Sequence, residues 1–528
     1  MSSESKSSAV QNVRVVTAAA LFDGHDAAIN VMRRLIQAEG CEVIHLAHNR
    51  SVVEVVDSAV QEDAHAVAVT SYQGGHVDYF LYLRQLLDER GAAHVRIFGG
   101  GGGVIVPEEA DELHKQGITR IYHPEDGRRM GLVGMIKDLV SKCDQDLLNG
   151  ELPPFDDLLA ADPATVARYI TAVEADVDGA GVVPESVKAA ISEAGGGNGA
   201  PVVGITGTGG AGKSSLTDEL VRRLRSDFPD LKIAVLSVDP TRRRTGGALL
   251  GDRIRMNAVY GTTGGGGCCF MRSLATRDSK SELSDAIGAA IAVVKAAGFE
   301  LVLLETSGIG QGNSEITEFS DISLYVMTPE YGAATQLEKI DMLDYADMVI
   351  LNKYERRGAE DALRDIRKQV RRNSNDFDSP DEELAVYGTV AARFNDEGVN
   401  GAYLGLLSKV AQFSGRAWPS RLKPCRPVSG VGSALIAPER VRYLGEIAAV
   451  VRGYHSWAAA QVTAARRKEM LEFAARELDG EPAASLVAKA EAVDLAPESK
   501  AILDSWESDR KTYSGDEFVY TVRGREIR

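Results

Sequence analysis

Residues 207–214 read Gly207-Thr208-Gly209-Gly210-Ala211-Gly212-Lys213-Ser214 and decide the fold of this 528-residue chain. They match the phosphate-loop pattern G-x-x-x-x-G-K-[ST], between an apolar run at 201–206 and a helical pattern at 215–224. In such a loop the glycines let successive backbone N–H groups turn toward phosphate oxygens. The strand before the loop and the helix after it favour a nucleotide site over a glycine-rich turn that happens to contain Gly-Lys-Ser.

The side chains and the backbone of this loop have separate predicted roles. Lys213 would reach the β- and γ-phosphate oxygens, and the Ser214 hydroxyl would hold Mg²⁺ at the N-terminus of the helix. Lys213 is therefore also a catalytic candidate. The rest of the predicted phosphate cradle is backbone, and it consists of Gly207, Gly210, Ala211, Gly212 and Ser215.

Two carboxylates follow strands that should flank the loop. The next strand ends at Asp239, where a carboxylate can hold Mg²⁺ directly or through water. A later strand ends at Glu305, followed by a glycine hinge at 306–311, which is where phosphate-loop enzymes place a metal-proximal acid. This makes Glu305 the second catalytic candidate. Between them, residues 246–256 are polar and rich in glycine, the character of a loop that orders around a γ-phosphate.

The nucleotide base is predicted from Asn352-Lys353-Tyr354-Glu355, which follows an apolar strand and is close to the guanine-binding pattern N-K-x-D. A carboxylate in the last position accepts two hydrogen bonds from the N1–H and N2–H₂ edge of guanine, which adenine cannot supply. Glu355 stands where the pattern has Asp. The longer side chain can still make this contact, so Asn352, Lys353 and Glu355 predict GTP or GDP, with ATP left open.

Upstream, residues 13–145 alternate five apolar runs with helical patterns, which predicts a five-stranded parallel sheet with helices on both faces. Such sheets bind ligands at the carboxyl ends of their strands. Asp23-Gly24-His25-Asp26 follows the first run, 71–76 follows the third and Gly99–Gly103 follows the fourth. A carboxylate two residues before an imidazole can hold one ring nitrogen and leave the other to a metal, although one histidine cannot make a zinc site.

Taken with these glycines, Asp23-x-His25 resembles the cobalamin-binding domain of base-off/His-on enzymes, whose motifs are D-x-H-x-x-G, S-x-L and G-G. The resemblance implies that His25 is the lower axial ligand of cobalt and that Asp23 holds His25. It also implies that Ser71, Gly99 and Gly100 line the pocket of the dimethylbenzimidazole tail.

The chain departs from this pattern in two places. Ala28 stands where the first motif has its final glycine, and the middle motif reads Ser71-Tyr72-Gln73. Taken alone, Asp-x-His would most simply make a local hydrogen bond at the start of a helix. The glycines that accompany it favour the cobalamin site.

From about residue 202 to 415 the chain looks like the G-protein chaperones of cobalamin-dependent acyl-CoA mutases. By that resemblance Lys213 and Ser214 bind phosphate and Mg²⁺, and Asp239, Asp252 and Glu305 surround the metal. Hydrolysis would need positioned positive charge. The segments that carry the resemblance are Val238–Pro240, Gly247–Met256, Phe270–Arg277 and Glu305–Gln311, and the arginines available for the γ-phosphate are Arg255, Arg272 and Arg277.

The predicted fold class is α/β, with a flavodoxin-like parallel-sheet domain, then a phosphate-loop GTPase domain and a helical C-terminal linker. The predicted limits are 1–147 for the cobalamin-binding domain, 148–200 for a helical linker, 201–417 for the G-protein domain and 418–528 for a mostly helical linker region. No eight-fold β/α series follows, so no substrate-binding barrel is predicted in this chain.

Composition excludes several classes of protein. The net charge of −17 without a basic tract argues against a nucleic-acid partner. No apolar run approaches the ~20 residues of a membrane span, which predicts a cytoplasmic protein without a membrane partner. Five scattered cysteines are too few for a disulfide framework.

A cobalamin domain ahead of this kind of G domain resembles fused isobutyryl-CoA mutase, from residue 13 to 528. The resemblance implies adenosylcobalamin, Mg²⁺ and GTP/GDP as cofactors. It implies an acyl-CoA-binding barrel outside this chain as a partner, with a cobalamin adenosyltransferase and a homodimeric assembly as further partners. The alternatives are a nucleotide-gated cobalamin carrier or sensor, a chaperone for a methylmalonyl-CoA-type mutase and an ATP-dependent kinase.

Overall fold

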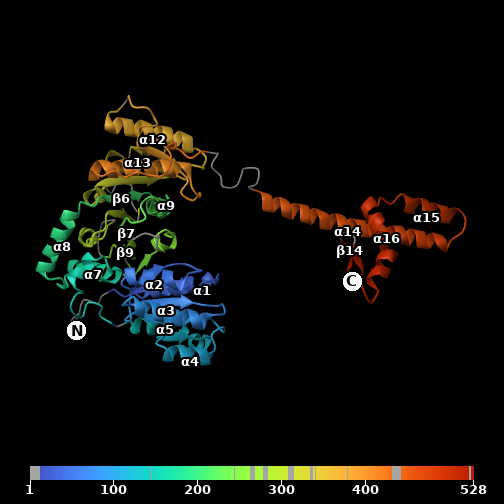
Figure 1. The fold of residues 1–528 in the computed structure, drawn as a ribbon, viewed down its shortest axis with the longest axis horizontal. Coiled ribbons are helices and arrows are strands. Elements are labelled where there is room, and N and C mark those ends of the chain that lie inside the picture. The colour runs from blue at the N-terminus through green and yellow to red at the C-terminus, as the bar shows by residue number, and fades with distance from the viewer. Residues whose placement is uncertain are drawn as a thin grey trace. The chain divides into compact units, whose positions relative to one another are not determined.

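The structure, a computed structural model, describes residues 12–143, 145–242, 244–261, 268–277, 283–306, 308, 314–332, 337–338, 340–376, 378–430, 442–522 and 525–527. Most of the predicted hinge at 306–311 lies outside these residues. The chain forms two compact units, Met1–Ser433 and Ala434–Arg528. The first contains two parallel sheets with their helices, and the second is mainly helical (Figure 1).

The first sheet confirms the predicted β/α alternation. Its strands from this part of the chain are β1 (Arg14–Ala19), β2 (Glu42–His45), β3 (Ala66–Thr70), β4 (Arg96–Gly100) and β5 (Arg120–Tyr122). The helices between and after them are α1 (Asp26–Ala38), α2 (Val52–Gln61), α3 (His76–Glu89), α4 (Pro107–Lys115) and α5 (Pro124–Ser141). Every residue of β1, β2 and β3 is buried, because helices cover both faces of the sheet. Most of these residues are apolar, and the buried polar ones include Arg14 and Glu42.

A sixth strand joins this sheet from the second half of the chain, which the sequence did not predict. The order is β5-β4-β3-β1-β2-β8, where β8 is Ala248–Leu250. It pairs with β2 in parallel, with Glu42 opposite Ala248 and Ile44 opposite Leu250. A three-residue strand inside a glycine-rich loop has too little pattern to be recognised, and its partner is about 200 residues away.

The second sheet holds the phosphate loop. Its order is β13-β12-β11-β6-β10-β7-β9, and all its pairs are parallel. The strands are β6 (Val202–Gly207), β7 (Ile233–Asp239), β9 (Cys269–Ala275), β10 (Leu301–Glu305), β11 (Ile322–Met327), β12 (Met348–Asn352) and β13 (Val386–Thr389). The helices are α6 (Phe155–Leu159), α7 (Pro163–Val177), α8 (Glu185–Asn198), α9 (Lys213–Asp227), α10 (Ile287–Ala296), α12 (Ala359–Ser374) and α13 (Glu397–Ser414).

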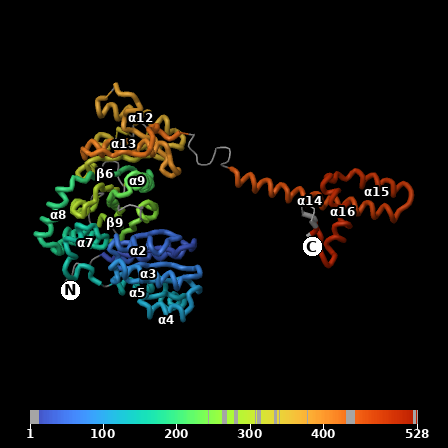
Figure 2. The backbone as a smooth tube through the Cα atoms, in the orientation of Figure 1, coloured from blue at the N-terminus to red at the C-terminus, as the bar shows by residue number. Residues whose placement is uncertain are grey.

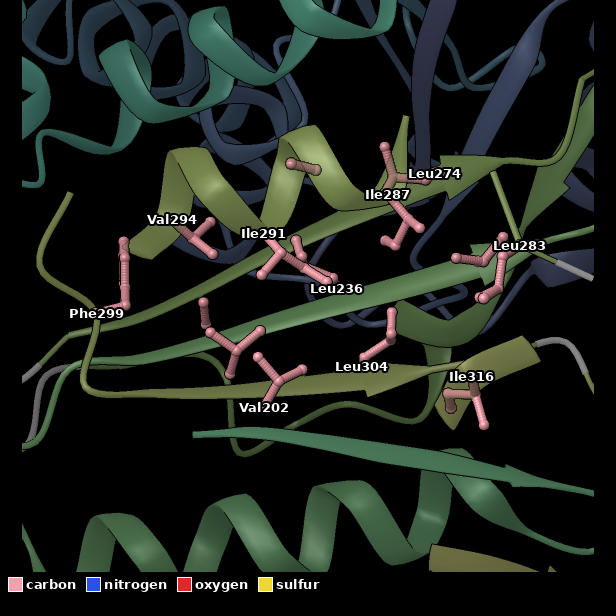
Figure 3. Packing of buried hydrophobic residues seen from close by; sticks show 14 of the residues in the cluster. Val202, Leu236, Leu274, Leu283, Ile287, Ile291, Val294, Phe299, Leu304 and Ile316 are labelled. Carbon is pink, nitrogen blue, oxygen red and sulfur yellow. The ribbon is translucent and has the colours of Figure 1, made fainter. Parts of the chain in front are cut away.

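Apolar side chains fill both faces of the second sheet. On one face, Leu236 and Leu304 of the sheet and Ile287 and Ile291 of α10 belong to a single buried cluster (Figure 3). A second cluster packs α9 and α13 on the other face. With both faces covered, only the strand ends are open to a ligand.

A buried ionic cluster joins α7 to both sheets. Glu174 of α7 lies 3.3 Å from Arg14 of β1, 2.7 Å from Arg272 of β9 and 3.2 Å from Arg277. Burial opposes the charge of Glu174, but the three guanidinium groups hold its pKa at about 2. Arg272 and Arg277 are therefore engaged with a carboxylate here. In this region α2 contacts both α7 and β9, and all three elements are labelled on the backbone tube of Figure 2.

The second unit consists of α14 (Tyr443–Arg476), α15 (Glu481–Glu491), α16 (Pro497–Tyr513) and a hairpin of β14 (Tyr520–Val522) and β15 (Arg525–Ile527). It begins later than the predicted limit of 418. Trp418 packs against Phe228 at 5.2 Å between ring centroids, and Ser429 donates to the Gly388 carbonyl at 2.8 Å, so these residues belong to the first unit. None of the described helices is both long and apolar enough to cross a membrane.

Candidate functional site

The phosphate loop connects β6 to α9 in a backbone form that needs glycine. Gly207 has φ +147°, and a Cβ on it would lie 1.8 Å from the Val326 carbonyl oxygen. Gly212 has φ +92°, and a Cβ there would lie 2.5 Å from Asn352 Nδ2. Both positions therefore exclude other residues, because the left-handed backbone and the close neighbours each disfavour a side chain.

Lys213 begins α9 and folds back over the loop. Its Nζ donates to the carbonyl oxygens of Gly207 at 3.1 Å and Thr208 at 3.4 Å, and the residue is only 7% exposed. A buried ammonium group at the N-terminus of a helix is a strong attractor for a phosphate group. Ala211 and Ser215 lie where predicted, in the loop and in the first turn of α9.

Ser214 lies among the predicted carboxylates. Its Oγ donates to Glu305 Oε1 at 2.8 Å and to Asp252 Oδ1 at 3.2 Å. Asp239 accepts the backbone N–H of Gly251, next to Asp252, at 2.8 Å. The fold thus brings Asp239, Asp252 and Glu305 to one side of the phosphate loop, as predicted.

These carboxylates repel one another. Burial, reinforced by the charge of Asp252, raises the pKa of Asp239 to about 8 and that of Glu305 to about 8. Burial also raises the pKa of Asp252. Such a group of acids fits a divalent cation, which would restore their charged forms. Within the described residues no group of three or more His, Cys, Asp or Glu side chains is placed so that it could hold a metal ion together.

Thr217 is a neighbour of this cluster that the sequence did not reveal. Its hydroxyl donates to Glu305 Oε2 at 2.9 Å, while Ser214 binds the other carboxylate oxygen. The two hydroxyls are three residues apart and share one helix face. The spacing of these two hydroxyl residues is the signal from which Thr217 could have been predicted. Their two hydrogen bonds fix the orientation of the Glu305 carboxylate.

The predicted base-binding residues contact the phosphate loop. Asn352 donates from Nδ2 to the Ala211 carbonyl at 2.7 Å, and Lys353 Nζ donates to the Gly210 carbonyl at 2.6 Å. Asn352 Oδ1 accepts the Ala391 N–H at 3.0 Å. Ala391 follows β13, and sequence reasoning missed it. Glu355 lines a cavity of about 530 Å³ together with Arg356, Arg357 and Arg393.

In the first sheet, Asp23 holds His25. Asp23 is fully buried, and its Oδ1 accepts His25 Nδ1 at 2.8 Å and the His25 N–H at 2.9 Å. Its Oδ2 accepts the Tyr72 N–H at 2.6 Å. Burial opposes the charge, but hydrogen bonds from Tyr72 and His25 keep the pKa of Asp23 below its usual value. The His25 side chain is 65% exposed, so Nε2 is the ring nitrogen that can meet a metal.

A cavity of about 300 Å³ opens at the carboxyl ends of β3 and β4, and Ala28, Gly99 and Gly100 line it. A Cβ on Gly99 would lie 2.4 Å from Phe80 Cζ, so this glycine also permits packing on the opposite face of the sheet. The cavity wall is mainly apolar, with residues from α1 and α5. Its place and character suit an aromatic tail.

Ser71, predicted to line the pocket of the tail, is not among the residues that line this cavity. Thr70, one residue earlier at the end of β3, lines it instead, because successive residues of a strand face opposite sides. Thr70 Oγ1 is buried without a hydrogen-bond partner among the described residues. An unpaired hydroxyl in a buried wall is costly unless a ligand satisfies it, so the cavity fits a ligand with a polar atom at that point.

Two family models match the chain. Residues 13–122 match the B12 binding domain, and residues 166–408 match the methylmalonyl-CoA mutase-associated GTPase MeaB. The chain carries a B12-binding domain and a MeaB-type GTPase domain. These findings confirm the predicted α/β fold class, with cobalamin and a guanine nucleotide as the ligands of its two domains.

Curated relatives extend the match to nearly the whole chain. The fused isobutyryl-CoA mutases of Geobacillus kaustophilus and Cupriavidus metallidurans are each 51% identical over 98% of this chain, and that of Nocardia farcinica is 53% identical over 98%. The predicted resemblance to this family is confirmed. The chain covers 48%, 47% and 47% of these relatives, so it spans about half of their length.

Proposed function

We propose that this chain is the cofactor-binding and GTPase part of an adenosylcobalamin-dependent acyl-CoA mutase, of the type that converts isobutyryl-CoA to n-butyryl-CoA. GTP binding and hydrolysis would gate loading of the cofactor. The main support for this proposal is the exposed His25 imidazole, which Asp23 holds next to an apolar cavity. It lies in the same compact unit as a complete phosphate loop.

The residues of the first sheet would hold the cofactor. Asp23 accepts the Nδ1–H of His25, which fixes the ring and directs the Nε2 lone pair outward to cobalt. The Thr70 hydroxyl would form a hydrogen bond with the dimethylbenzimidazole tail of the cofactor. Gly99 and Gly100 would form the wall of the cavity against this tail. Adenosylcobalamin, when bound, supplies the radical chemistry of the carbon-skeleton rearrangement.

The residues of the second sheet would bind and hydrolyse GTP. Lys213 and the N-terminus of α9 would bind the β- and γ-phosphates. Ser214 would coordinate Mg²⁺, with Asp239, Asp252 and Glu305 around it, and Asn352 and Lys353 would support the base. The Glu355 carboxylate would accept hydrogen bonds from the guanine base once the loop after β12 moves toward the phosphate loop. Positioned charge is the main source of catalysis in such sites.

The other half of the activity would come from outside the chain. A barrel that binds acyl-CoA is the proposed partner, either as a further part of the same polypeptide or as a separate subunit. A homodimer in the cytoplasm, loaded by a cobalamin adenosyltransferase, completes the proposal. The domain limits of 1–147, 148–200, 201–417 and 418–528 stay part of it, except that residues 418–430 pack with the first unit.

Two measurements test this function. Cobalamin bound to the wild-type chain should show the absorption spectrum of histidine-ligated cobalt, and His25→Ala should lose it while keeping the fold. The chain, mixed with the separately expressed barrel half of a fused relative, should convert isobutyryl-CoA to n-butyryl-CoA when adenosylcobalamin is present. An unchanged His25→Ala spectrum, or tighter binding of ATP than of GTP, would count against the proposal.

A further inference from the structure

One short segment, residues 248–260, lies between the two proposed sites. Its strand β8 pairs with β2 of the first sheet. The next residues reach the proposed nucleotide site, where the Gly251 N–H donates to Asp239 at 2.8 Å and Asp252 accepts from Ser214 at 3.2 Å. The segment that carries a proposed Mg²⁺ neighbour is thus built into the sheet that carries His25.

Arg50, in the loop after β2, holds this segment from the cobalamin side. Its Nη2 donates to the Ile254 carbonyl at 3.3 Å, and its Nη1 donates to Asn257 Oδ1 at 3.3 Å. The guanidinium carbon lies 5.8 Å from the centre of the Tyr260 ring. The side chain is 9% exposed, so these contacts are shielded from water. The planar guanidinium is pre-organised, so it can hold several partners in fixed positions at a small entropic cost.

The same residue is tied to the loop that presents His25. The backbone N–H of Arg50 donates to the Ala19 carbonyl at 3.1 Å, and Arg50 forms a parallel bridge with Ala20. Its neighbour Asn49 accepts the Phe22 N–H at 2.8 Å. Phe22 immediately precedes Asp23, and so a continuous chain of contacts runs from His25 to Asp252.

Arg50 is also held internally in one conformation. Its Nε donates to the Leu46 carbonyl at 2.6 Å, and its Nη1 lies 3.2 Å from Glu54 Oε1. Glu54 in turn closes a capping box with Ser51 at the start of α2. The guanidinium therefore cannot swing independently of the loop after β2, and any shift of that loop must move its contacts with the 248–260 segment.

We propose that Arg50 couples the cobalamin and nucleotide sites. The contacts of Arg50 go to residues other than those proposed to hold either ligand. It is a positioning residue that makes the placement of the Asp252 loop depend on the placement of the His25 loop. This rests on the proposed function of both sites. Because binding linkage is reciprocal, cobalamin should change the affinity for nucleotide by the same factor as nucleotide changes the affinity for cobalamin.

A second contact spans the same interface but is less suited to a test. Arg253, fully buried, lies 2.6 Å from Glu62 Oε1. Removing either partner would leave a buried charge unpaired and would endanger the fold. The contacts of Arg50 with the 248–260 segment go to a carbonyl, an amide oxygen and a ring, so no buried carboxylate of that segment is left unpaired when they are lost.

The experiment measures linkage in binding. The dissociation constant of a non-hydrolysable GTP analogue is measured by calorimetry with and without saturating cobalamin, for the full chain and for Arg50→Met. In the wild-type chain, the dissociation constants measured with and without cobalamin should differ by at least about fivefold, and this factor is the linkage ratio. In Arg50→Met it should fall below about twofold, while each ligand alone binds within about threefold of wild type.

The matched control is Arg90→Met. Arg90 follows α3 in the helical layer of the first sheet and pairs with Asp57 of α2 at 2.9 Å, but its side chain is 48% exposed and this ion pair stays within the first sheet's helices. It should keep the wild-type ratio. Arg50→Lys keeps the charge without the planar fork and should also lose most of the linkage.

A folded Arg50→Met variant with the wild-type ratio would overturn the proposal, and so would a wild-type ratio of one. If Arg50→Met does not fold, two other variants test the same chain of contacts. Asn49→Ala removes the hydrogen bond to Phe22, Asn257→Ala removes the hydrogen bond to Arg50, and each should lower the linkage ratio. Retention of the full ratio by both would equally refute it. Failure of the proposed function is distinguishable, because the wild-type chain would then bind no cobalamin or no GTP analogue at all.

Discussion

Replacing Asp23 by Asn tests the loop that presents His25. The Asp23 carboxylate is fully buried and accepts three hydrogen bonds, two from His25 and one from Tyr72. Asn offers one carbonyl oxygen in place of two. When that oxygen accepts from His25, the amide nitrogen faces the Tyr72 N–H, and two donors oppose each other.

The expected losses of stability and of cobalamin affinity in Asp23→Asn follow from these contacts. One buried N–H left without an acceptor costs about 1–3 kcal/mol, so Asp23→Asn should lower the free energy of unfolding by that amount. Loss of a carboxylate that orients a metal-binding histidine typically weakens metal affinity by about 10–100-fold, and we expect that range for cobalamin. Because the pKa of Asp23 is held below its usual value, its stabilising contribution is present above the usual carboxyl range and is lost as the pH falls.

The assay combines a spectroscopic cobalamin titration with urea unfolding at neutral and acidic pH. Asp26→Asn is the control, because Asp26 is the next carboxylate along and its Oδ2 makes one exposed contact with Asn30 at 3.3 Å. The control should bind cobalamin like wild type. If Asp23→Asn also kept the wild-type affinity and the same loss of stability with acid, the assignment of Asp23 as the residue that orients His25 would be refuted.

Three further predictions concern the second sheet and its junction with the first. Gly212→Ala should abolish tight binding of a fluorescent GTP analogue, because its Cβ would lie 2.5 Å from Asn352 Nδ2; near-normal binding would contradict the loop geometry. Glu174→Gln should destabilise the chain by about 3–5 kcal/mol in urea, since it leaves buried arginines uncompensated, whereas the exposed Glu185→Gln should change little. The Glu305 carboxyl has its pKa raised to about 8, so the unfolding free energy of the nucleotide-free chain should fall as pH rises from the usual carboxyl range toward 8. Magnesium with GDP should remove that dependence, and a flat profile without them would refute the raised pKa.

Local patterns allowed much of the molecule to be predicted. The glycines and Lys213 of the phosphate loop are specified by backbone form and charge within eight residues, so they are visible in sequence. The Asp23–His25 contact is equally local, with two residues of separation. The α/β order of both sheets follows from apolar runs that are buried on both faces.

What escaped prediction depends on contacts that are distant in sequence. Thr70 rather than Ser71 lines the cavity, and a shift of one residue along a strand reverses the face that a side chain takes. Glu174 contacts Arg14 across 160 residues, and no local pattern marks such a pair. The sequence left Arg272 available to bind a phosphate, but in the fold its guanidinium group forms an ion pair with Glu174.

Strand β8 has a consequence for how this chain can be divided. Without it, β2 would be the edge of the first sheet, with unpaired N–H and C=O groups beside Val43 and Ile44, and such an edge invites other chains to pair with it. A fragment ending at the predicted limit of 147 should therefore tend to aggregate. A chimera that replaced the second domain by a foreign counterpart would have to supply a matching strand, because β8 of the second half completes the sheet of the first.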